Sequence, residues 1–140
     1  MFLIRTVLGP SHGIGVFADE DVSAGQIVWR FDPRFDQTFD TIAGLGEPLA
    51  SFLKKYAYLD PTRGVYVLCG DHARFVNHSD APNLRPGREG ASGLYIHDVA
   101  ARPIPRGDEL TIDYRLIHAG PHELACSFRD GSGVRERSGE

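Results

Sequence analysis

The sequence predicts a small, mainly β protein with one or two short helices. Its 140 residues suit a single domain with one hydrophobic core. Hydrophobic residues make up 41% and charged residues 24%, which is typical of a folded globular chain rather than a disordered one. The 16 glycines and 9 prolines favour many short elements joined by turns and argue against a bundle of long helices.

Three strands are predicted in the first third of the chain. Residues 2–8 and 26–31 are rich in aliphatic and aromatic side chains, and residues 14–18 form a shorter run of the same kind. Glycine and proline within residues 9–13 separate the first strand from the second, and Gly25 marks the turn before the third.

A helical pattern lies in the middle of the chain. Residues 47–58 place apolar side chains at the spacing of one helix face, with Pro48 suited to the first turn. The Asp-Pro dipeptide at residues 60–61 marks the end of this helix. Beyond it, we expect strands at 64–70, 94–101 and 109–114, one helical turn at 71–76, a loop at 77–93 and a fraying end at 129–140.

Charge and cysteine content restrict the partner and the compartment. A formal net charge of -4 argues against nonspecific nucleic-acid binding, which needs a basic surface. The charge suits a Lys-rich peptide as partner, although ordinary acidity explains it at least as well. Cys69 and Cys126 form no CxxC pair, so the sequence excludes a cysteine-ligated zinc site and predicts no metal. Isolated cysteines, no signal peptide and no run of transmembrane length predict a cytoplasmic protein without a membrane partner.

Three segments carry patterns that suit a binding site. Residues 11–18 place glycines at alternate positions, which lets a ligand lie against the backbone. Residues 74–83 gather polar side chains that are costly to bury unless they bind a ligand or hold a loop together. Residues 107–114 lead from a turn into a strand that ends on Tyr114. Each pattern alone also fits a structural role, as a plain turn, a satisfied polar pair or a packed tyrosine.

In this order and spacing, the three segments together resemble the SET-domain family of protein lysine methyltransferases. The first is similar to the family's Gly-x-Gly stretch, and the second to its Arg-Phe-x-Asn-His-Ser-x-x-Pro-Asn motif. The third is similar to Gly-Glu-Glu-Leu-Thr-x-Asp-Tyr, with Asp108 in place of the first Glu. The resemblance implies a SET domain at residues 1–116, followed by a degenerate, partly flexible post-SET-like tail at 117–140.

The resemblance implies a β-clip-like SET fold in which the second and third motifs form a C-terminal pseudoknot. It also implies protein-lysine N-methyltransferase activity, with S-adenosylmethionine as cofactor and a Lys-containing protein or peptide as substrate. Tyr114, beside the transferring methyl group, and Tyr66, in the lysine channel, are the expected catalytic residues. The expected cofactor-binding residues are His12, Gly13, Ile14, Gly15, Tyr56, Tyr58, Arg74, Phe75, Asn77, His78 and Tyr114.

The same resemblance implies individual roles and opposite entry faces for the cofactor and the lysine. Asn77 is expected to bond the amino or the carboxylate end of the cofactor, and His78 to hold the adenine mainly through backbone groups. Either Tyr56 or Tyr58 is expected to stack near the cofactor. A dry aromatic channel suits the reaction, because a lysine with a free pKa of about 10.4 must lose a proton before it attacks a methyl group.

Two departures from the family pattern leave questions open. Ile112 stands two residues before Tyr114, where many members carry Phe or Tyr, so the number of methyl groups added is not determined. The tail lacks the Cys-rich zinc module with which many members close the lysine channel. Either Phe128 packing over the site or a second subunit, in a homodimer, is an alternative closure.

Other functions remain open from the sequence. A non-catalytic SET-like module that binds cofactor or peptide fits the missing zinc module, although Tyr114, Asn77 and His78 favour an enzyme. A β module that binds carbohydrate or metal is disfavoured, because the sequence has no dense carboxylate or histidine cluster. Within the enzymes, methylation of a small molecule or of a group other than lysine is the main alternative.

Overall fold

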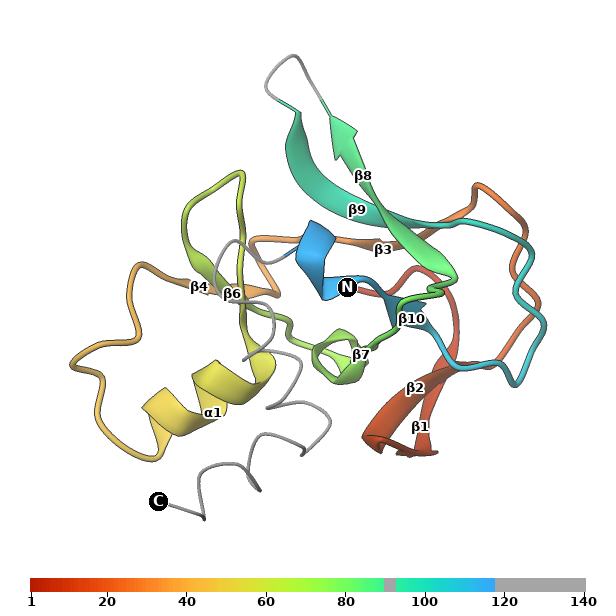
Figure 1. Cartoon of the computed structure of the whole chain (residues 1–140). Helices are drawn as coiled ribbons and strands as arrows, with labels where there is room; N and C mark the ends of the chain where they lie inside the picture. Colours follow the sequence, from red (N-terminus) through yellow and green to blue (C-terminus); the bar gives the residue numbers. More distant parts are fainter. Residues whose placement is uncertain (90–92, 118–140) are drawn as a thin grey trace.

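Short strands dominate the fold, as predicted (Figure 1). The computed structural model describes residues 1–89 and 93–117. Its elements in chain order are β1 (Thr6–Ser11), β2 (Gly13–Ala18), β3 (Ile27–Arg30), β4 (Gln37–Phe39), α1 (Leu49–Tyr56), β5 (Tyr58–Leu59), β6 (Tyr66–Leu68), the 3-10 helix η1 (His72–Phe75), β7 (Asn77–His78), β8 (Leu84–Glu89), β9 (Leu94–Ala100), β10 (Thr111–Ile112) and the 3-10 helix η2 (Tyr114–Leu116). The mainly β fold with short helices is therefore confirmed.

The strands of the described residues form four small sheets, with the orders β1-β2, β10-β7, β3-β9-β8 and β4-β6-β5. The pairs are antiparallel except for β7 and β10, which run parallel. Thr111 lies opposite Asn77, and Ile112 lies opposite His78. This short parallel ladder joins the second motif to the third, the two segments in which the pseudoknot is expected.

The hairpin of β1 and β2 runs through the predicted break. Pro10 pairs with Ile14 and Ser11 with Gly13, so the chain reverses at His12. Gly13 has a φ of 76°, which glycine adopts without strain. Pro10 is tolerated because β1 is an edge strand, on which a missing N–H breaks no ladder bond when it faces outward. The predicted break between the two strands is therefore confirmed at His12, but it is shorter than residues 9–13 because the strands extend through Ser11 and from Gly13.

The predicted loop at 77–93 is wrong, because it contains β7 and β8. β8 pairs along β9, with a register shift between Gly87 and Arg88. Pro86 and Gly87 give this segment a low intrinsic strand propensity, and the pairing with β9 overrides it. The short strands β4 and β5 escape prediction as well, because runs of two or three residues carry no periodic signal.

Other elements are confirmed with shifted ends. Helix α1 covers 49–56 of the predicted 47–58, and η1 covers 72–75 of the predicted helical turn at 71–76. The strand predicted at 109–114 is shorter, because the chain turns into η2 at Tyr114. In the described part of the chain, no helix has the length and apolarity that crossing a membrane requires.

A large core beneath the β3-β9-β8 sheet includes residues from the segments near all three motifs, among them Val16, Val76, Leu110, Tyr114 and Ile117. A smaller core under α1 contains Ile42, Leu53, Ala57 and Leu68. The predicted tail begins at Ile117, yet this side chain packs in the large core. The remainder of that tail, with Cys126 and Phe128, lies outside the described residues, so its boundary and the closure by Phe128 stay predictions.

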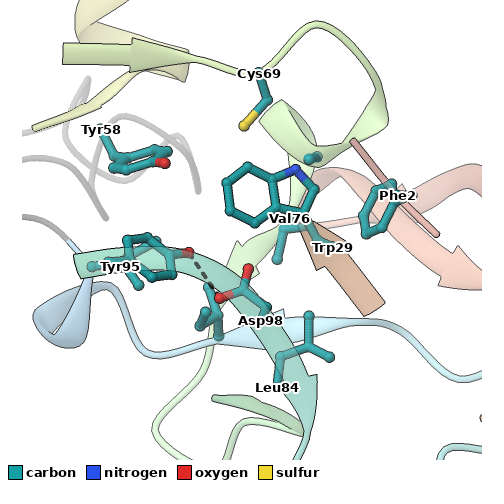
Figure 2. A pocket seen from close by; sticks show the side chains of 11 residues that line it. Phe2, Trp29, Tyr58, Cys69, Val76, Leu84, Tyr95 and Asp98 are labelled. Carbon is teal, nitrogen blue, oxygen red and sulfur yellow. Dashed lines mark hydrogen bonds between the residues drawn. The ribbon is translucent and has the colours of Figure 1, made fainter. Parts of the chain in front are cut away.

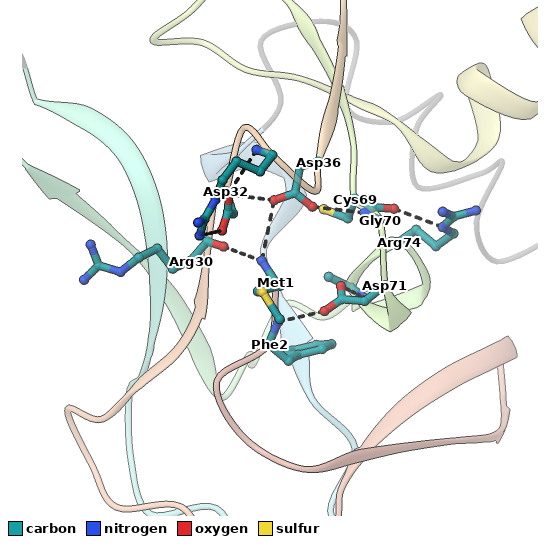
Figure 3. Close-up of polar contacts among 11 residues, drawn as sticks. Met1, Phe2, Arg30, Asp32, Asp36, Cys69, Gly70, Asp71 and Arg74 are labelled. Atoms are coloured by element: carbon teal, nitrogen blue, oxygen red, sulfur yellow. Dashed lines mark hydrogen bonds and ion pairs between the residues drawn. The ribbon is translucent and has the colours of Figure 1, made fainter.

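Polar contacts fix the start of η1 (Figure 3). The buried Asp36 carboxylate accepts a hydrogen bond of 3.0 Å from the N–H of Gly70, just before η1. Asp71 accepts hydrogen bonds from the N–H groups of Phe2, at 2.7 Å, and Ala73, at 3.1 Å. Because Asp71 caps η1, these bonds determine where the backbone that carries the second motif begins to turn.

Candidate active site

A surface pocket brings the first two motifs together. It has a volume of about 110 Å³ and is lined by Gly13, Ile14, Lys55, Tyr56, Arg74, Phe75 and Asn77. β2 supplies the first two residues, the end of α1 the next two, and the segment from η1 to β7 the last three. All of them except Lys55 are expected cofactor-binding residues. The structure therefore gathers most of the predicted cofactor site in one place.

A polar network centred on the buried Asn77, which lines the pocket, connects all three motifs. The Asn77 side-chain amide donates hydrogen bonds to the carbonyl oxygen of Ile14, at 3.1 Å, and to the carboxylate of Glu109, at 2.9 Å. The Ser11 hydroxyl donates to the other oxygen of Glu109 at 2.6 Å. Glu109 is not among the predicted site residues. The sequence could have indicated it, because Glu109 is an acidic residue of the third motif, just before the strand.

Close packing explains the glycine at position 15. A Cβ added there would lie 2.7 Å from the Glu109 carboxylate and 2.8 Å from Cβ of Ser11, both closer than real contacts. Gly15 is buried and does not line the pocket, whereas Gly13 does. The alternating glycines therefore serve two different purposes. His12 is exposed at the hairpin turn and is not among the described lining residues.

Tyr114 is buried and held by the second motif. Its hydroxyl donates a hydrogen bond of 2.6 Å to the carbonyl oxygen of Val76, and its backbone N–H donates one of 3.0 Å to Nδ1 of His78. Because Nδ1 accepts, the ring proton of a neutral His78 is assigned to Nε2, which lies 3.0 Å from the Asp80 carboxylate. The neighbours of Val76 in sequence, Phe75 and Asn77, line the pocket. Tyr114 thus lies directly behind the pocket wall.

Aromatic side chains form the pocket wall on the side of α1. Tyr56 contacts Phe75 edge-on, with ring centroids 5.2 Å apart, and Phe52 at 4.8 Å. Arg74 lies over Phe52 at 5.6 Å, and its Nε donates a hydrogen bond of 3.1 Å to the carbonyl oxygen of Cys69. Of the two tyrosines that the sequence left as alternatives, Tyr56 is the one at this pocket.

A second, buried cavity contains Tyr58 (Figure 2). It measures about 30 Å³ and is lined mainly by aromatic and aliphatic side chains, with Asp98 among them. The hydroxyl of Tyr95 donates a hydrogen bond of 2.8 Å to Asp98. Burial raises the pKa of Asp98 to about 7, against the lowering effect of that bond, and burial also raises the pKa of Tyr58 and of Tyr95 well above the usual range.

The two cavities lie on opposite sides of one backbone segment. Ala73 and Val76 line the buried cavity, whereas Arg74, Phe75 and Asn77 line the surface pocket. Side chains of the segment 73–77 therefore face both ways. The opposite entry faces expected for the cofactor and the lysine stay a prediction, because the described residues do not include a lysine-sized channel at the 30 Å³ cavity.

Tyr66 lies away from these groups. It is part of β6, where it pairs with Phe39 and Leu59, and its side chain packs against the small core under α1. Tyr114 belongs to the large core instead. The two expected catalytic tyrosines thus pack in different cores, and a role of Tyr66 in the lysine channel stays a prediction.

Comparison with known proteins places the chain in a family. The profile of the family described as SET domain matches residues 13–115, which include most of the first motif and all of the second and third. The chain belongs to the SET-domain family. Within this family, the chain is 30% identical over 127 residues to a histone-lysine N-methyltransferase, H3 lysine-36 specific, from Yarrowia lipolytica. That match covers 81% of this SET protein and 15% of the relative.

Solved structures agree on the fold. The crystal structure of the Chaetomium thermophilum polycomb repressive complex 2 superposes with a TM-score of 0.60 at 26% identity, covering 79% of this chain and 15% of that chain. The same type of complex, ctPRC2 in an autoinhibited conformation bound to S-adenosylmethionine, gives a TM-score of 0.62 at 21% identity and covers 96% of this chain and 17% of that one. The chain thus spans about a sixth of each of these three proteins.

Proposed function

We propose that this SET domain transfers a methyl group from S-adenosylmethionine to a lysine side chain of a protein or peptide. The supporting observation is the polar network in which Asn77 joins the three motifs beside a pocket lined by predicted cofactor-binding residues. The relatives named as histone-lysine methyltransferases support a protein lysine as the acceptor. Histones themselves are a candidate substrate class, and the cytoplasmic location stays a prediction.

The donor and acceptor pattern of the pocket fits the amino-acid part of this cofactor. Both protons of the Asn77 amide nitrogen are committed to Ile14 and Glu109, so its oxygen is the atom that faces a ligand as an acceptor. An acceptor suits the ammonium end of the cofactor. Of the two ends that the sequence left open for Asn77, we therefore assign the amino end. The aromatic side chains of Tyr56 and Phe75 in the pocket lining also suit a positively charged sulfonium.

For this reaction the protein has to position the two reacting groups and to keep water away from the substrate lysine. When bound, S-adenosylmethionine supplies an electrophilic methyl group on sulfur. The neutral amine of the substrate lysine forms the new carbon–nitrogen bond as the carbon–sulfur bond breaks, and its surplus proton leaves to water. The hydrogen bond to Val76 fixes the orientation of the Tyr114 hydroxyl. Holding the lysine amine in line with the methyl group can contribute up to roughly 7–11 kcal/mol.

Isothermal titration with S-adenosylmethionine, comparing wild type with Asn77→Ala, tests the cofactor site. We expect clear binding by the wild type and loss of binding in the variant, because the variant removes the acceptor and the tie to Glu109. A folded wild type that binds no cofactor would contradict the proposal. It would favour the alternative of a non-catalytic module or a site completed by a partner.

Transfer of a labelled methyl group to Lys-rich proteins tests the reaction itself. Tyr114→Phe is expected to lower the rate of transfer while cofactor binding persists, because the ring still fills the core and only the hydroxyl is lost. Labelled arginine or small molecules instead of labelled lysine would support the main alternative among the enzymes. Cofactor binding without any transfer would support the non-catalytic module.

A further inference from the structure

The surface pocket has an uneven distribution of charge. Two of its described lining residues, Lys55 and Arg74, are cationic, and none is acidic. Glu109 does not line the pocket, and its carboxylate accepts hydrogen bonds from the Asn77 amide and the Ser11 hydroxyl, so one nearby negative charge stands against the two cations. A pocket of this composition attracts an anionic group on its ligand.

The two cations are not equally available. Arg74 donates through Nε to the carbonyl oxygen of Cys69 and lies over the ring of Phe52, so its guanidinium also has a structural task. Lys55 lies with its Nζ 5.3 Å from the ring centroid of Tyr56 and forms no ion pair with any residue in the ranges 1–89 and 93–117. Its ammonium therefore lies at the pocket without a counter-ion from the described part of the chain.

From this arrangement we propose that Lys55 binds the α-carboxylate of S-adenosylmethionine. The inference rests on the proposed function, since it assigns one group of the proposed cofactor. The cofactor carries a single anionic group, its α-carboxylate, and Lys55 meets that group from the end of α1. On the same ligand, the oxygen of Asn77 accepts from the adjacent ammonium. Asn77 and Lys55 thus bind the two oppositely charged groups that are attached to the α-carbon of the ligand.

Lys55 acts on binding rather than on the chemical step. The carboxylate is not changed by methyl transfer, and it is present in both the cofactor and the demethylated product. An interaction that is equal in the ground state and the transition state changes KM and leaves kcat alone. Loss of Lys55 is therefore expected to raise KM for the cofactor without changing kcat.

Titration of matched variants with two ligands tests the assignment. Lys55→Gln removes the charge, Lys55→Arg keeps it, and Lys54→Gln removes the charge of the neighbouring lysine, which is exposed and does not line the pocket. The ligands are S-adenosylmethionine and decarboxylated S-adenosylmethionine, which lacks the carboxylate alone. Circular dichroism checks that each variant is folded.

Lys55→Gln is expected to weaken binding of S-adenosylmethionine by up to about fivefold, the upper end of the range for an exposed charge pair. It should not weaken binding of the decarboxylated ligand, Lys55→Arg should restore most of the affinity, and Lys54→Gln should have no effect. If Lys55→Gln weakened binding of both ligands equally, or of neither, the assignment of Lys55 would be overturned, while the proposed function would stand. If the folded wild type binds neither ligand, the proposed function fails and this inference fails with it.

Discussion

Asn77 illustrates how much one side chain decides at the residue scale. Its amide nitrogen bonds a backbone carbonyl in β2 and a carboxylate that precedes β10, so a single buried group aligns three segments that are far apart in sequence. Replacing Asn77 is expected to lower the free energy of unfolding, because each hydrogen-bond partner left unpaired in a buried site costs about 1–3 kcal/mol. The residue that binds the ligand also organises the pocket.

Asp98 gives a pH dependence that can be measured at a single residue. Burial raises its folded-state pKa to about 7, from 3.8 in the unfolded chain. Between these values the folded state binds more protons than the unfolded state, so this group's contribution to stability is fullest at low pH. It is lost as pH rises through the folded-state pKa. The wild type should therefore be less stable at pH 8 than an otherwise identical chain with a neutral residue at 98.

Urea unfolding of wild type and Asp98→Asn at pH 5 and pH 8 checks this expectation. Asparagine retains an acceptor for the Tyr95 hydroxyl and does not titrate. Relative to wild type, the variant should gain roughly 2–3 kcal/mol between pH 5 and pH 8, since each pKa unit corresponds to about 1.4 kcal/mol. A stability difference that is the same at both pH values would show that Asp98 is not a buried, titrating carboxylate.

At the scale of elements, the parallel ladder of β7 and β10 is short. Each strand has two residues, too few to be stable through ladder bonds alone. The buried side chain of Asn83 reinforces it by accepting a hydrogen bond of 2.9 Å from the N–H of Thr111 and donating one of 2.8 Å to the carbonyl oxygen of Glu109. The second asparagine of the middle motif thus supports the strand that carries the third.

Asn83→Ala should destabilise the fold by about 2–4 kcal/mol, because it leaves a backbone donor and a backbone acceptor unpaired near the core. Chemical denaturation measures this loss. Ser79→Ala serves as the control, since its hydroxyl accepts a single exposed hydrogen bond from Ala81 and should cost less than about 0.5 kcal/mol. Equal effects of the two substitutions would mean that Asn83 is not the support of β10.

For the whole molecule, stability depends on a few polar links between segments that the sheets do not pair. Arg63 forms a hydrogen-bonded ion pair with the fully buried Asp60, donates to the carbonyl oxygen of Tyr95 at 2.6 Å, and lies 4.1 Å from the ring centroid of Phe31. One side chain therefore joins the loop after β5 to β9 and to the end of β3. Arg34, in contrast, pairs with Asp32 on the surface.

Arg63→Ala is expected to cost about 3–5 kcal/mol, because it strands a buried carboxylate without its partner. Arg34→Ala should cost much less than Arg63→Ala, because solvent screens an exposed ion pair. Thermal and urea unfolding of both variants at one pH give the comparison. If Arg34→Ala proved as damaging as Arg63→Ala, burial would not be what makes the Asp60 pair important.

The sequence by itself determined the fold class, the helix near α1, the family and most residues of the pocket, because these depend on motifs and spacing that are local in the chain. Tertiary structure alone decided the direction in which each side chain points. It placed Tyr56 at the surface pocket and Tyr58 in the buried cavity, two residues apart, since the chain leaves α1 and enters β5 between them. It also placed Glu109 against Asn77 and Lys55 at the surface pocket, and it formed β8 although residues 84–89 have a low intrinsic strand propensity. These outcomes depend on contacts between distant segments, which no local pattern encodes.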